Sequence, residues 1–124
     1  MKRIYGVSVD FIDGFNQSAR SVHPDEFICY HRAEEGVITE MILVPGTIYG
    51  DSHSFISEWM TPIDLSRAGS AHSHPGHSNE PSDADLTFFS QMGGVHFITC
   101  LPYDRSSWKA YDSRGRTVEL ELVF

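Results

Sequence analysis

Residues 95–101, VHFITCL, place the strongest constraint on the fold. Side chains on a strand point alternately to its two faces, and this segment is apolar on both of them. A strand of this kind is typical of the centre of a sheet that is covered from both sides. The rest of the chain therefore has to supply neighbouring strands and covering helices.

Two segments are expected to form those helices. The first begins after Ser8, which suits an N-cap, and should end at Pro24. The second runs from about Ser82 to Met92, and the glycine pair at 93–94 should stop it. Each has apolar residues at helical spacing: these are Phe11, Phe15, Ala19 and Val22 in the first helix, and Leu86, Phe89 and Met92 in the second.

Several further segments have the composition and alternation of strands. They are residues 3–7, 26–32, 37–44 and 69–74, a short candidate at 53–57, and a closing hairpin of 107–111 with 117–123. In the last segment the apolar side chains should face inward and the acidic ones outward: Val118, Leu120 and Leu122 in, Glu119 and Glu121 out. Together these elements predict an α/β architecture, an α+β sandwich in which helices flank a mixed sheet.

The chain is expected to be one domain, residues 1–124, because its length leaves no room for two hydrophobic cores. The formal net charge of −8 argues against a nucleic-acid surface, which normally carries a basic patch. No apolar run approaches the roughly 20 residues that cross a bilayer, and residues 1–10 lack the features of a secretory signal. Cys29 and Cys100 lie in apolar runs, which favours buried thiols in a reducing cytoplasm, although a bridge between neighbouring strands stays open.

The chemistry of the sequence concentrates in residues 71–85, AHSHPGHSNEPSDAD. On a strand, His72 and His74 project from the same face and can point at one ion. Asp85, eleven positions beyond His74, can add a carboxylate from the first turn of the helix that Ser82 introduces. Two nitrogens, one carboxylate oxygen and an open position are typical of a catalytic zinc and not of a closed structural site.

Each of these residues also has a structural interpretation. A His-x-His pair on a strand is usually two ordinary residues, and Ser82-x-x-Asp85 resembles a capping box. His77 is a rival ligand, although its Gly- and Asn-containing surroundings favour a surface loop. The remaining histidines are interpreted as structural or exposed: His23, His31, His53 and His96. The combination of both motifs at this spacing favours the metal site.

His72-x-His74-Pro75 followed by Ser82-x-x-Asp85 resembles the signature of the JAMM (MPN+) metalloproteases, in particular the small archaeal-type, desampylase-like isopeptidases. Two further segments extend the resemblance over essentially the whole chain. SVHPDEF at 21–27 is similar to the segment that carries the family's catalytic glutamate, and CLPYDRSSWKAYDSRG at 100–115 to the closing strands of small archaeal members. The resemblance implies the JAMM/MPN fold, which is cytidine-deaminase-like, with the metal at the edge of the sheet.

The resemblance also implies site residues and a mechanism. One Zn²⁺ ion would be held by the metal ligands His72, His74 and Asp85, and would lower the pKa of a water to about 7. Glu26 would be the general acid/base, and Ser82 would donate a hydrogen bond to the oxyanion of the tetrahedral intermediate. From the residues alone, Glu40 and Glu58 would compete with Glu26.

The implied substrates are conjugates of ubiquitin-like modifier proteins, because JAMM peptidases commonly cut the isopeptide bond between a modifier's C-terminal glycine and a lysine. The same site would serve a hydrolase that trims an adduct from the C-terminus of a sulfur-carrier protein. A non-catalytic MPN scaffold is disfavoured, since all three metal ligands are retained. A zinc nucleobase deaminase is also disfavoured, because the chain lacks His-x-Glu and Pro-Cys-x-x-Cys. Residues 45–66 would either border the cleft for an extended tail or only complete the core.

One position departs from the family pattern. Many members have a glycine three residues after the glutamate, where this chain has Cys29. The position lies within a predicted strand, so we expect an effect on local packing and little effect on catalysis.

Overall fold

The computed structural model describes residues 3–43 and 67–124. The region 45–66, with its strand candidate and with His53 and Glu58, lies outside the described residues. Neither described helix is long and apolar enough to cross a membrane. The helices are α1 (Val9–Val22) and α2 (Asp83–Met92), and the strands are β1 (Gly6–Ser8), β2 (Ile28–Glu34), β3 (Val37–Ile42), β4 (Arg67–Ser73), β5 (Val95–Thr99), β6 (Trp108–Tyr111), β7 (Thr117–Val118) and β8 (Glu121–Val123).

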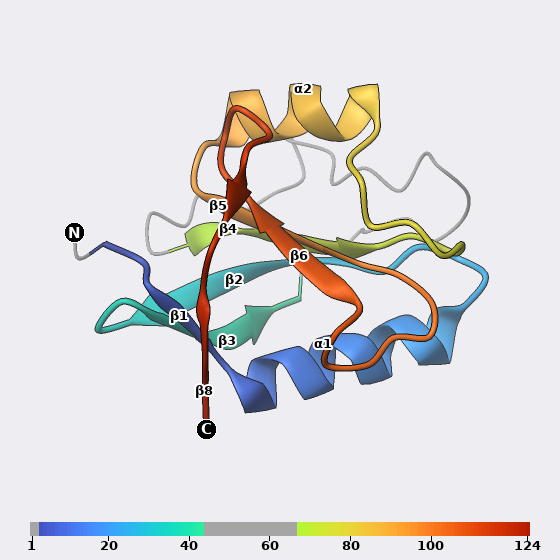
Figure 1. Cartoon of the computed structure of the whole chain (residues 1–124), viewed down its shortest axis with the longest axis horizontal. Coiled ribbons are helices and arrows are strands. Elements are labelled where there is room, and N and C mark those ends of the chain that lie inside the picture. Colours follow the sequence, from blue (N-terminus) through green and yellow to red (C-terminus); the bar gives the residue numbers. More distant parts are fainter. Residues whose placement is uncertain (1–2, 44–66) are drawn as a thin grey trace.

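Strand β5 lies inside the sheet, as its apolar sequence predicts. It pairs in parallel with β4 and antiparallel with β6. Helices α1 and α2 cover opposite faces of the sheet (Figure 1). Phe97 belongs to the core cluster beside α1, whereas Ile98 packs with Phe89 of α2. The described strands form one mixed sheet in the order β7-β6-β5-β4-β2-β3-β1-β8, which confirms the predicted α/β sandwich.

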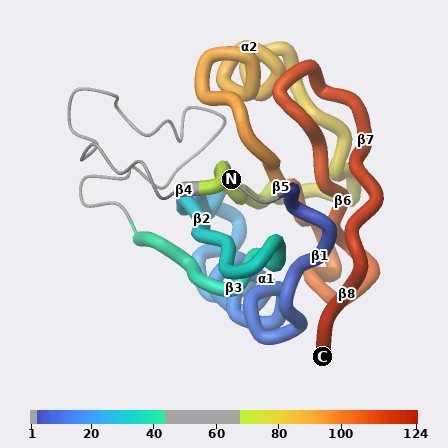
Figure 2. Tube along the Cα trace, turned by 90° about the vertical axis from the view of Figure 1, so that its left-hand side faces the viewer, coloured from blue at the N-terminus to red at the C-terminus, as the bar shows by residue number. Residues whose placement is uncertain are grey.

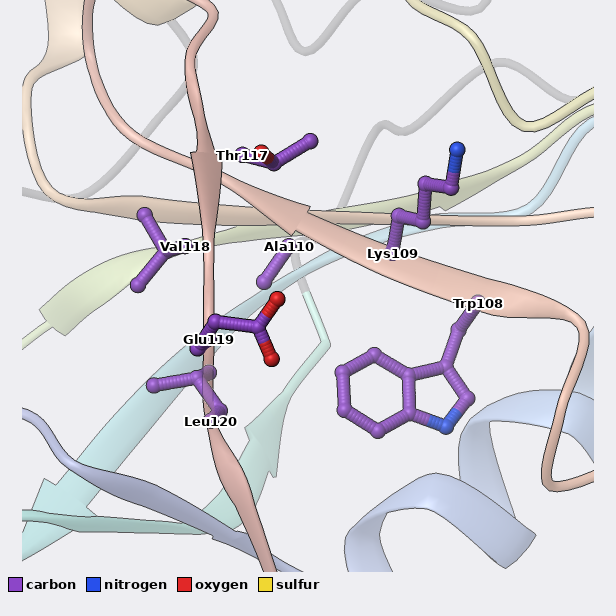
Figure 3. Close-up of a pocket in the computed structure, with 7 residues that line it drawn as sticks. All are labelled: Trp108, Lys109, Ala110, Thr117, Val118, Glu119 and Leu120. Atoms are coloured by element: carbon purple, nitrogen blue, oxygen red, sulfur yellow. The ribbon is translucent and has the colours of Figure 1, made fainter.

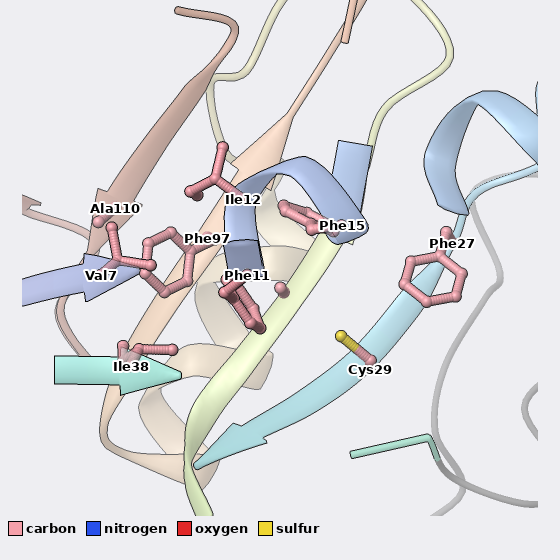
Figure 4. Close-up of a cluster of buried hydrophobic side chains, with 10 residues drawn as sticks. Val7, Phe11, Ile12, Phe15, Phe27, Cys29, Ile38, Phe97 and Ala110 are labelled. Atoms are coloured by element: carbon pink, nitrogen blue, oxygen red, sulfur yellow. The ribbon is translucent and has the colours of Figure 1, made fainter. Parts of the chain in front are cut away.

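Helix α1 is capped by Ser8 and packs one apolar face on the sheet. The Ser8 hydroxyl accepts a hydrogen bond from the Phe11 N–H at 3.0 Å, which satisfies one of the donors of the first turn. The Phe11 ring lies 5.7 Å from that of Phe97, between centroids. Phe15 of α1 and Phe27, which precedes β2, extend the same cluster (Figure 4). The predicted cap and apolar face of this helix are therefore confirmed.

Helix α2 packs aromatic side chains on the other face. Phe89 is fully buried, and its ring stacks on that of His96 with 4.4 Å between centroids. Phe88 packs with Phe89, and Phe88 and Met92 also pack against Ile28 and Tyr30 of β2. Leu86, predicted to share this buried face, is instead 36% exposed. The contact with the sheet is centred between Phe88 and Met92, so Leu86 is left at its rim.

The core also contains thiols and imidazoles. Cys29 and Cys100 are buried free thiols and form no disulfide, as their apolar surroundings in the sequence predict. Cys29, the departure from the family pattern, lies in the cluster beside α1. Burial lowers the pKa of His31 to about 3 and that of His96 to about 4, so both rings are neutral at pH 7. His96 is held between the Ser70 hydroxyl and a backbone carbonyl, each at 2.6 Å.

The predicted closing hairpin is correct only for its first half. Strand β7 pairs with β6, but the chain then leaves β6, and β8 pairs in parallel with β1 at the opposite end of the strand order. The sheet curls so far that residues 119 and 120 alone connect the two strands (Figure 2). The inward and outward positions of this segment agree with the prediction: the apolar side chains are half-buried and Glu119 and Glu121 are exposed.

A pocket opens where residues 117–120 leave β6 (Figure 3). The Trp108 indole lies beside it, with its ring 5.6 Å from that of Phe97. The pocket is lined by Trp108, Lys109, Ala110, Thr117, Val118, Glu119 and Leu120. It marks the point at which the ladder between β6 and the C-terminal segment ends.

Gly69 is a position at which the sheet has no room for a side chain. Its φ is +152°, and a Cβ atom added there would lie 1.7 Å from the Val95 carbonyl oxygen. Gly69→Ala should lower the free energy of unfolding by at least about 2 kcal/mol, because overpacking and backbone strain each cost about 1–3 kcal/mol. Urea unfolding followed by circular dichroism measures this loss.

Gly14→Ala provides the matched control within α1. A Cβ atom at Gly14 would meet nothing within 4 Å. Alanine in a helix interior is favoured over glycine by about 0.5–1 kcal/mol, so this variant should be as stable as the wild type or more so. Equal stability of the two variants would contradict the close approach of β4 and β5 at Gly69.

Candidate metal centre

The end of β4 brings the two histidines together. His72 is the last but one residue of β4, and His74 follows the strand. Their rings are 5.1 Å apart between centroids. The neighbouring strand holds this segment, because His72 pairs with Ile98 in register and the His74 N–H donates to the Thr99 carbonyl oxygen at 2.9 Å. The two-residue period of a strand therefore extends to His74.

Asp85 approaches the histidines from the first turn of α2. The Ser82 hydroxyl accepts a hydrogen bond from the Asp85 N–H at 3.1 Å, and the Ser82 N–H donates to Asp85 Oδ2 at 2.9 Å. This reciprocal pair is a capping box. The capping box orients the Asp85 carboxylate. Ser82-x-x-Asp85 can therefore cap α2 and present a metal ligand at the same time.

The carboxylate lies between the two imidazoles. Asp85 Oδ1 is 3.1 Å from His72 Nε2, and Asp85 Oδ2 is 3.1 Å from His74 Nε2. One possible ligand atom from each residue lies within 4.8 Å of the other two. The side chain of His72 is only 5% exposed, whereas those of His74 and Asp85 are 18% and 17% exposed. The group is therefore buried on the His72 side and accessible from the side of His74 and Asp85.

The surroundings of the histidines fit a zinc ion. Both ring nitrogens of His72 are buried and have no hydrogen-bond partner within the described part of the chain. Its Nε2 is close to Asp85 but not directed for a hydrogen bond, as expected of two ligands of one ion. His74 Nδ1 lies 3.0 Å from the Ser78 carbonyl oxygen, and by donating to it leaves Nε2 available to a metal. Two nitrogens and one carboxylate oxygen suit zinc.

The charges at the site also suit a cation. Burial by itself would raise the pKa of Asp85, but its contacts with His72 and His74 hold that pKa well below its usual range. Burial lowers the pKa of His74, yet hydrogen bonds with Asp85 and with the Ser78 carbonyl raise it overall. A proton on His74 thus takes the place that a metal cation would occupy, and the two compete for the site.

Glu26 and Ser82 lie at the same pocket as two of these ligands. The described residues that line it are Glu26, His74, Pro75, Gly76, His77, Ser78, Ser82 and Asp85. Glu26 shortly precedes β2, and the pairing of Ile28 with His72 brings this segment beside the end of β4. Glu40, its competitor from sequence, instead forms an ion pair with Arg32 at 3.0 Å.

The other histidines in the described part of the chain lie outside the group of possible ligands. His77 lines the pocket but is exposed, and the group contains His72, His74 and Asp85. His23 is also exposed, with its Nε2 3.2 Å from the Pro75 carbonyl oxygen.

Sequence reasoning missed Tyr103 as a support of the site. Its buried hydroxyl donates to the His74 carbonyl oxygen at 2.9 Å. The two residues are 29 positions apart, and no spacing rule relates them. Only the likeness of residues 100–115 to the closing strands of small JAMM proteins pointed to this part of the chain.

Removing the carboxylate charge tests the proposed ligand set. Asp85→Asn keeps an oxygen that can accept the capping hydrogen bond but loses the anionic ligand, so zinc affinity should fall by at least about 100-fold, more than the 10–100-fold typical of second-shell changes. Competition with a chromogenic chelator gives the affinity, and mass spectrometry the zinc content. Asp83→Asn, on the same helical turn and exposed, should bind zinc like the wild type. Wild-type affinity in Asp85→Asn would exclude Asp85 as a ligand, and equal losses in both variants would attribute the effect to the negative charge of this helical turn.

Residues 9–111 match the family described as prokaryotic homologs of the JAB domain. A curated relative from Haloferax volcanii, a probable metalloprotease, is 30% identical over 132 residues. That alignment covers 98% of this chain and 81% of the relative.

Two solved structures are similar in both fold and sequence. One, described as JAMM, a metalloprotease-like zinc site in the proteasome and signalosome, has a TM-score of 0.78 and 34% identity, over 98% of this chain and 99% of that chain. The other, a JAB1/MPN domain protein from Archaeoglobus fulgidus, has a TM-score of 0.77 and 33% identity, over 97% of each chain. Together with the grouped His72, His74 and Asp85, these similarities identify a metallohydrolase whose cofactor is one zinc ion. The chain belongs to the prokaryotic homologs of the JAB domain, within the JAMM/MPN+ family.

Proposed function

We propose that this chain is a zinc isopeptidase that hydrolyses the bond between the C-terminal glycine of a ubiquitin-like modifier and a lysine amine. One observation carries the proposal: Glu26, Ser82 and two of the three clustered ligands line a single pocket. Amide hydrolysis needs an acid/base group, a donor for the oxyanion and an electrophilic centre within reach of one another. These residues supply that combination.

In this mechanism Glu26 moves the proton. Zinc bound by His72, His74 and Asp85 would supply Lewis acidity, which lowers the pKa of water to about 7 and polarises the scissile carbonyl. The half-buried Glu26 carboxylate accepts a proton from the attacking water. It then transfers this proton to the leaving lysine amine, so one group acts first as base and then as acid.

Ser82 has a second hydrogen-bonding capacity beyond its cap. As the N-cap of α2, its oxygen accepts from the Asp85 N–H. A hydroxyl has two acceptor lone pairs and one donor, so the cap does not use the O–H proton. In the proposed mechanism this O–H donates to the carbonyl oxygen as negative charge develops on it.

A modifier conjugate is the substrate that the resemblance favours. Its flexible tail, ending in glycine, would approach a pocket whose described lining includes the small residues Gly76, Ser78 and Ser82. The Haloferax relative, a probable metalloprotease, supports an amide bond as the target. We place the activity in the cytoplasm, in agreement with the two free, buried thiols. No nucleic acid or membrane enters the proposed reaction.

Glu26→Gln tests the acid/base role. Glutamine keeps the size of the side chain but cannot carry the proton, so kcat should fall by at least about 100-fold, the lower end of the effect of general acid/base catalysis. The assay is cleavage of a Gly-Gly-lysine isopeptide conjugate by the zinc-loaded protein, with zinc content measured in the same samples. Wild-type cleavage should stop when a chelator removes the metal.

Glu40→Gln is the matched control, because Glu40 is the competing acid and pairs with Arg32 instead of lining the pocket. It should cleave like the wild type. If Glu26→Gln also cleaved like the wild type, the role of Glu26 would be wrong. If zinc-loaded wild type left the conjugate intact but removed an adduct from a Gly-Gly tail, the adduct-trimming alternative would replace the isopeptidase.

Comparing two helix caps separates the catalytic from the structural role of Ser82. Ser82→Ala and Ser8→Ala each remove an N-cap hydroxyl, so each should lower the free energy of unfolding by about 1 kcal/mol. Only Ser82→Ala should also lose about 10²–10³-fold in kcat, the usual effect of losing an oxyanion donor. Thermal unfolding and the conjugate assay measure the two effects. An equal loss of activity in both variants would show that Ser82 acts through stability alone.

A further inference from the structure

Ser73, the residue between the two histidines, is fully buried. Side chains on a strand alternate between faces, so Ser73 points to the opposite face from His72. Its hydroxyl accepts a hydrogen bond from the Phe27 N–H at 2.8 Å, and its own N–H donates to the Phe27 carbonyl oxygen at 2.9 Å. These two bonds join the end of β4 to the residue that follows Glu26.

The Ser73 hydroxyl replaces a backbone carbonyl as the hydrogen-bond acceptor at the end of the β2–β4 ladder. The register pairs Cys29 with Ala71 and Ile28 with His72, so the next pair in sequence is Phe27 with Ser73. In a regular antiparallel hydrogen-bonded pair, each N–H donates to the carbonyl of the other residue. Here the Phe27 N–H donates to the Ser73 side chain, and β2 begins only at Ile28.

We propose that the Ser73 hydroxyl is a positioning group for Glu26. By holding the Phe27 amide at the end of the ladder, it sets the direction in which the chain leaves the sheet and carries Glu26 to the pocket. The catalytic consequence rests on the proposed function, but the positioning itself does not. The metal ligands have further supports that do not involve the Ser73 hydroxyl: the His74 N–H donates to the Thr99 carbonyl, and the capping box holds Asp85.

Loss of the hydroxyl has a defined structural consequence. Phe27 is buried, and an amide N–H without an acceptor in such surroundings is unfavourable. In Ser73→Ala the Phe27 N–H loses this acceptor, so the segment that leaves the sheet at Phe27 opens more readily. The position of Glu26 relative to His74 is then less well defined.

The experiment compares Ser73→Ala with Ser73→Thr, which restores a hydroxyl, and with the control Ser70→Ala. Ser70 lies on the same strand, is equally buried, and its hydroxyl is 2.6 Å from His96 Nδ1, so its loss also removes a buried hydrogen bond. Two readouts need no substrate: amide exchange of Phe27 and the ¹³C signal of the Glu26 carboxyl. Ser73→Ala should speed Phe27 exchange by at least about tenfold and shift the carboxyl signal. Ser73→Thr and Ser70→Ala should change neither.

Zinc affinity and kinetics complete the test. Ser73→Ala should bind zinc like the wild type, yet its kcat on the isopeptide conjugate should fall by at least about tenfold, since displacing a catalytic group by about 1 Å can cost 100-fold. Ser73→Thr should recover that loss. If Ser73→Ala does not fold, Ser73→Cys, which keeps a weaker acceptor at this position, takes its place.

Two results would overturn the proposal. One is a Ser73→Ala protein with Phe27 exchange and a Glu26 carboxyl signal like those of the wild type. The other is an equal loss of kcat in Ser70→Ala, which would reduce the effect to general stability. A wild type that leaves the conjugate intact would count against the isopeptidase function only, because the exchange and carboxyl signals would still decide the position of Glu26.

Discussion

The metal site depends on the packing of α2 against the sheet. Strand β4 brings His72 and His74 together, but Asp85 belongs to a separate helix. Phe89 stacks on His96 of β5 and lies 6.3 Å from the His72 ring, between centroids. Because Phe89 follows Asp85 by about one helical turn, this contact sets the position of Asp85 over the end of β4. The aromatic core therefore determines whether three ligands meet.

The same groups stabilise the fold and prepare it for a cation. Ser82 and Asp85 complete the first turn of α2 before any ion is considered. A carboxylate already oriented by a cap loses little conformational entropy when it binds a metal. His74 is oriented in a similar way by the Ser78 carbonyl and, through its backbone, by Tyr103. The site is thus built from ordinary elements of secondary structure placed within reach of one another.

Local geometry explains which parts of this structure the sequence could predict. The spacing of His72 and His74 follows from the strand period, and Ser82 with Asp85 follows from helix capping, so both motifs could be placed from a few residues. The pairing of β8 with β1 could not, because it depends on contacts between distant segments. The position of Glu26 could not be predicted from spacing either. Only the family resemblance indicated it, because the ladder that brings Glu26 to the site joins Phe27 to Ser73, 46 positions apart. The rim position of Leu86 likewise depends on where the sheet meets α2.

The curl of the sheet also affects how the folded protein meets other chains. The outermost strands of the described sheet, β7 and β8, have two and three residues. Edge strands this short offer few unpaired N–H and C=O groups to a foreign strand. One short segment forms both edges, so the sheet gains part of the resistance to aggregation that barrels obtain by closing completely.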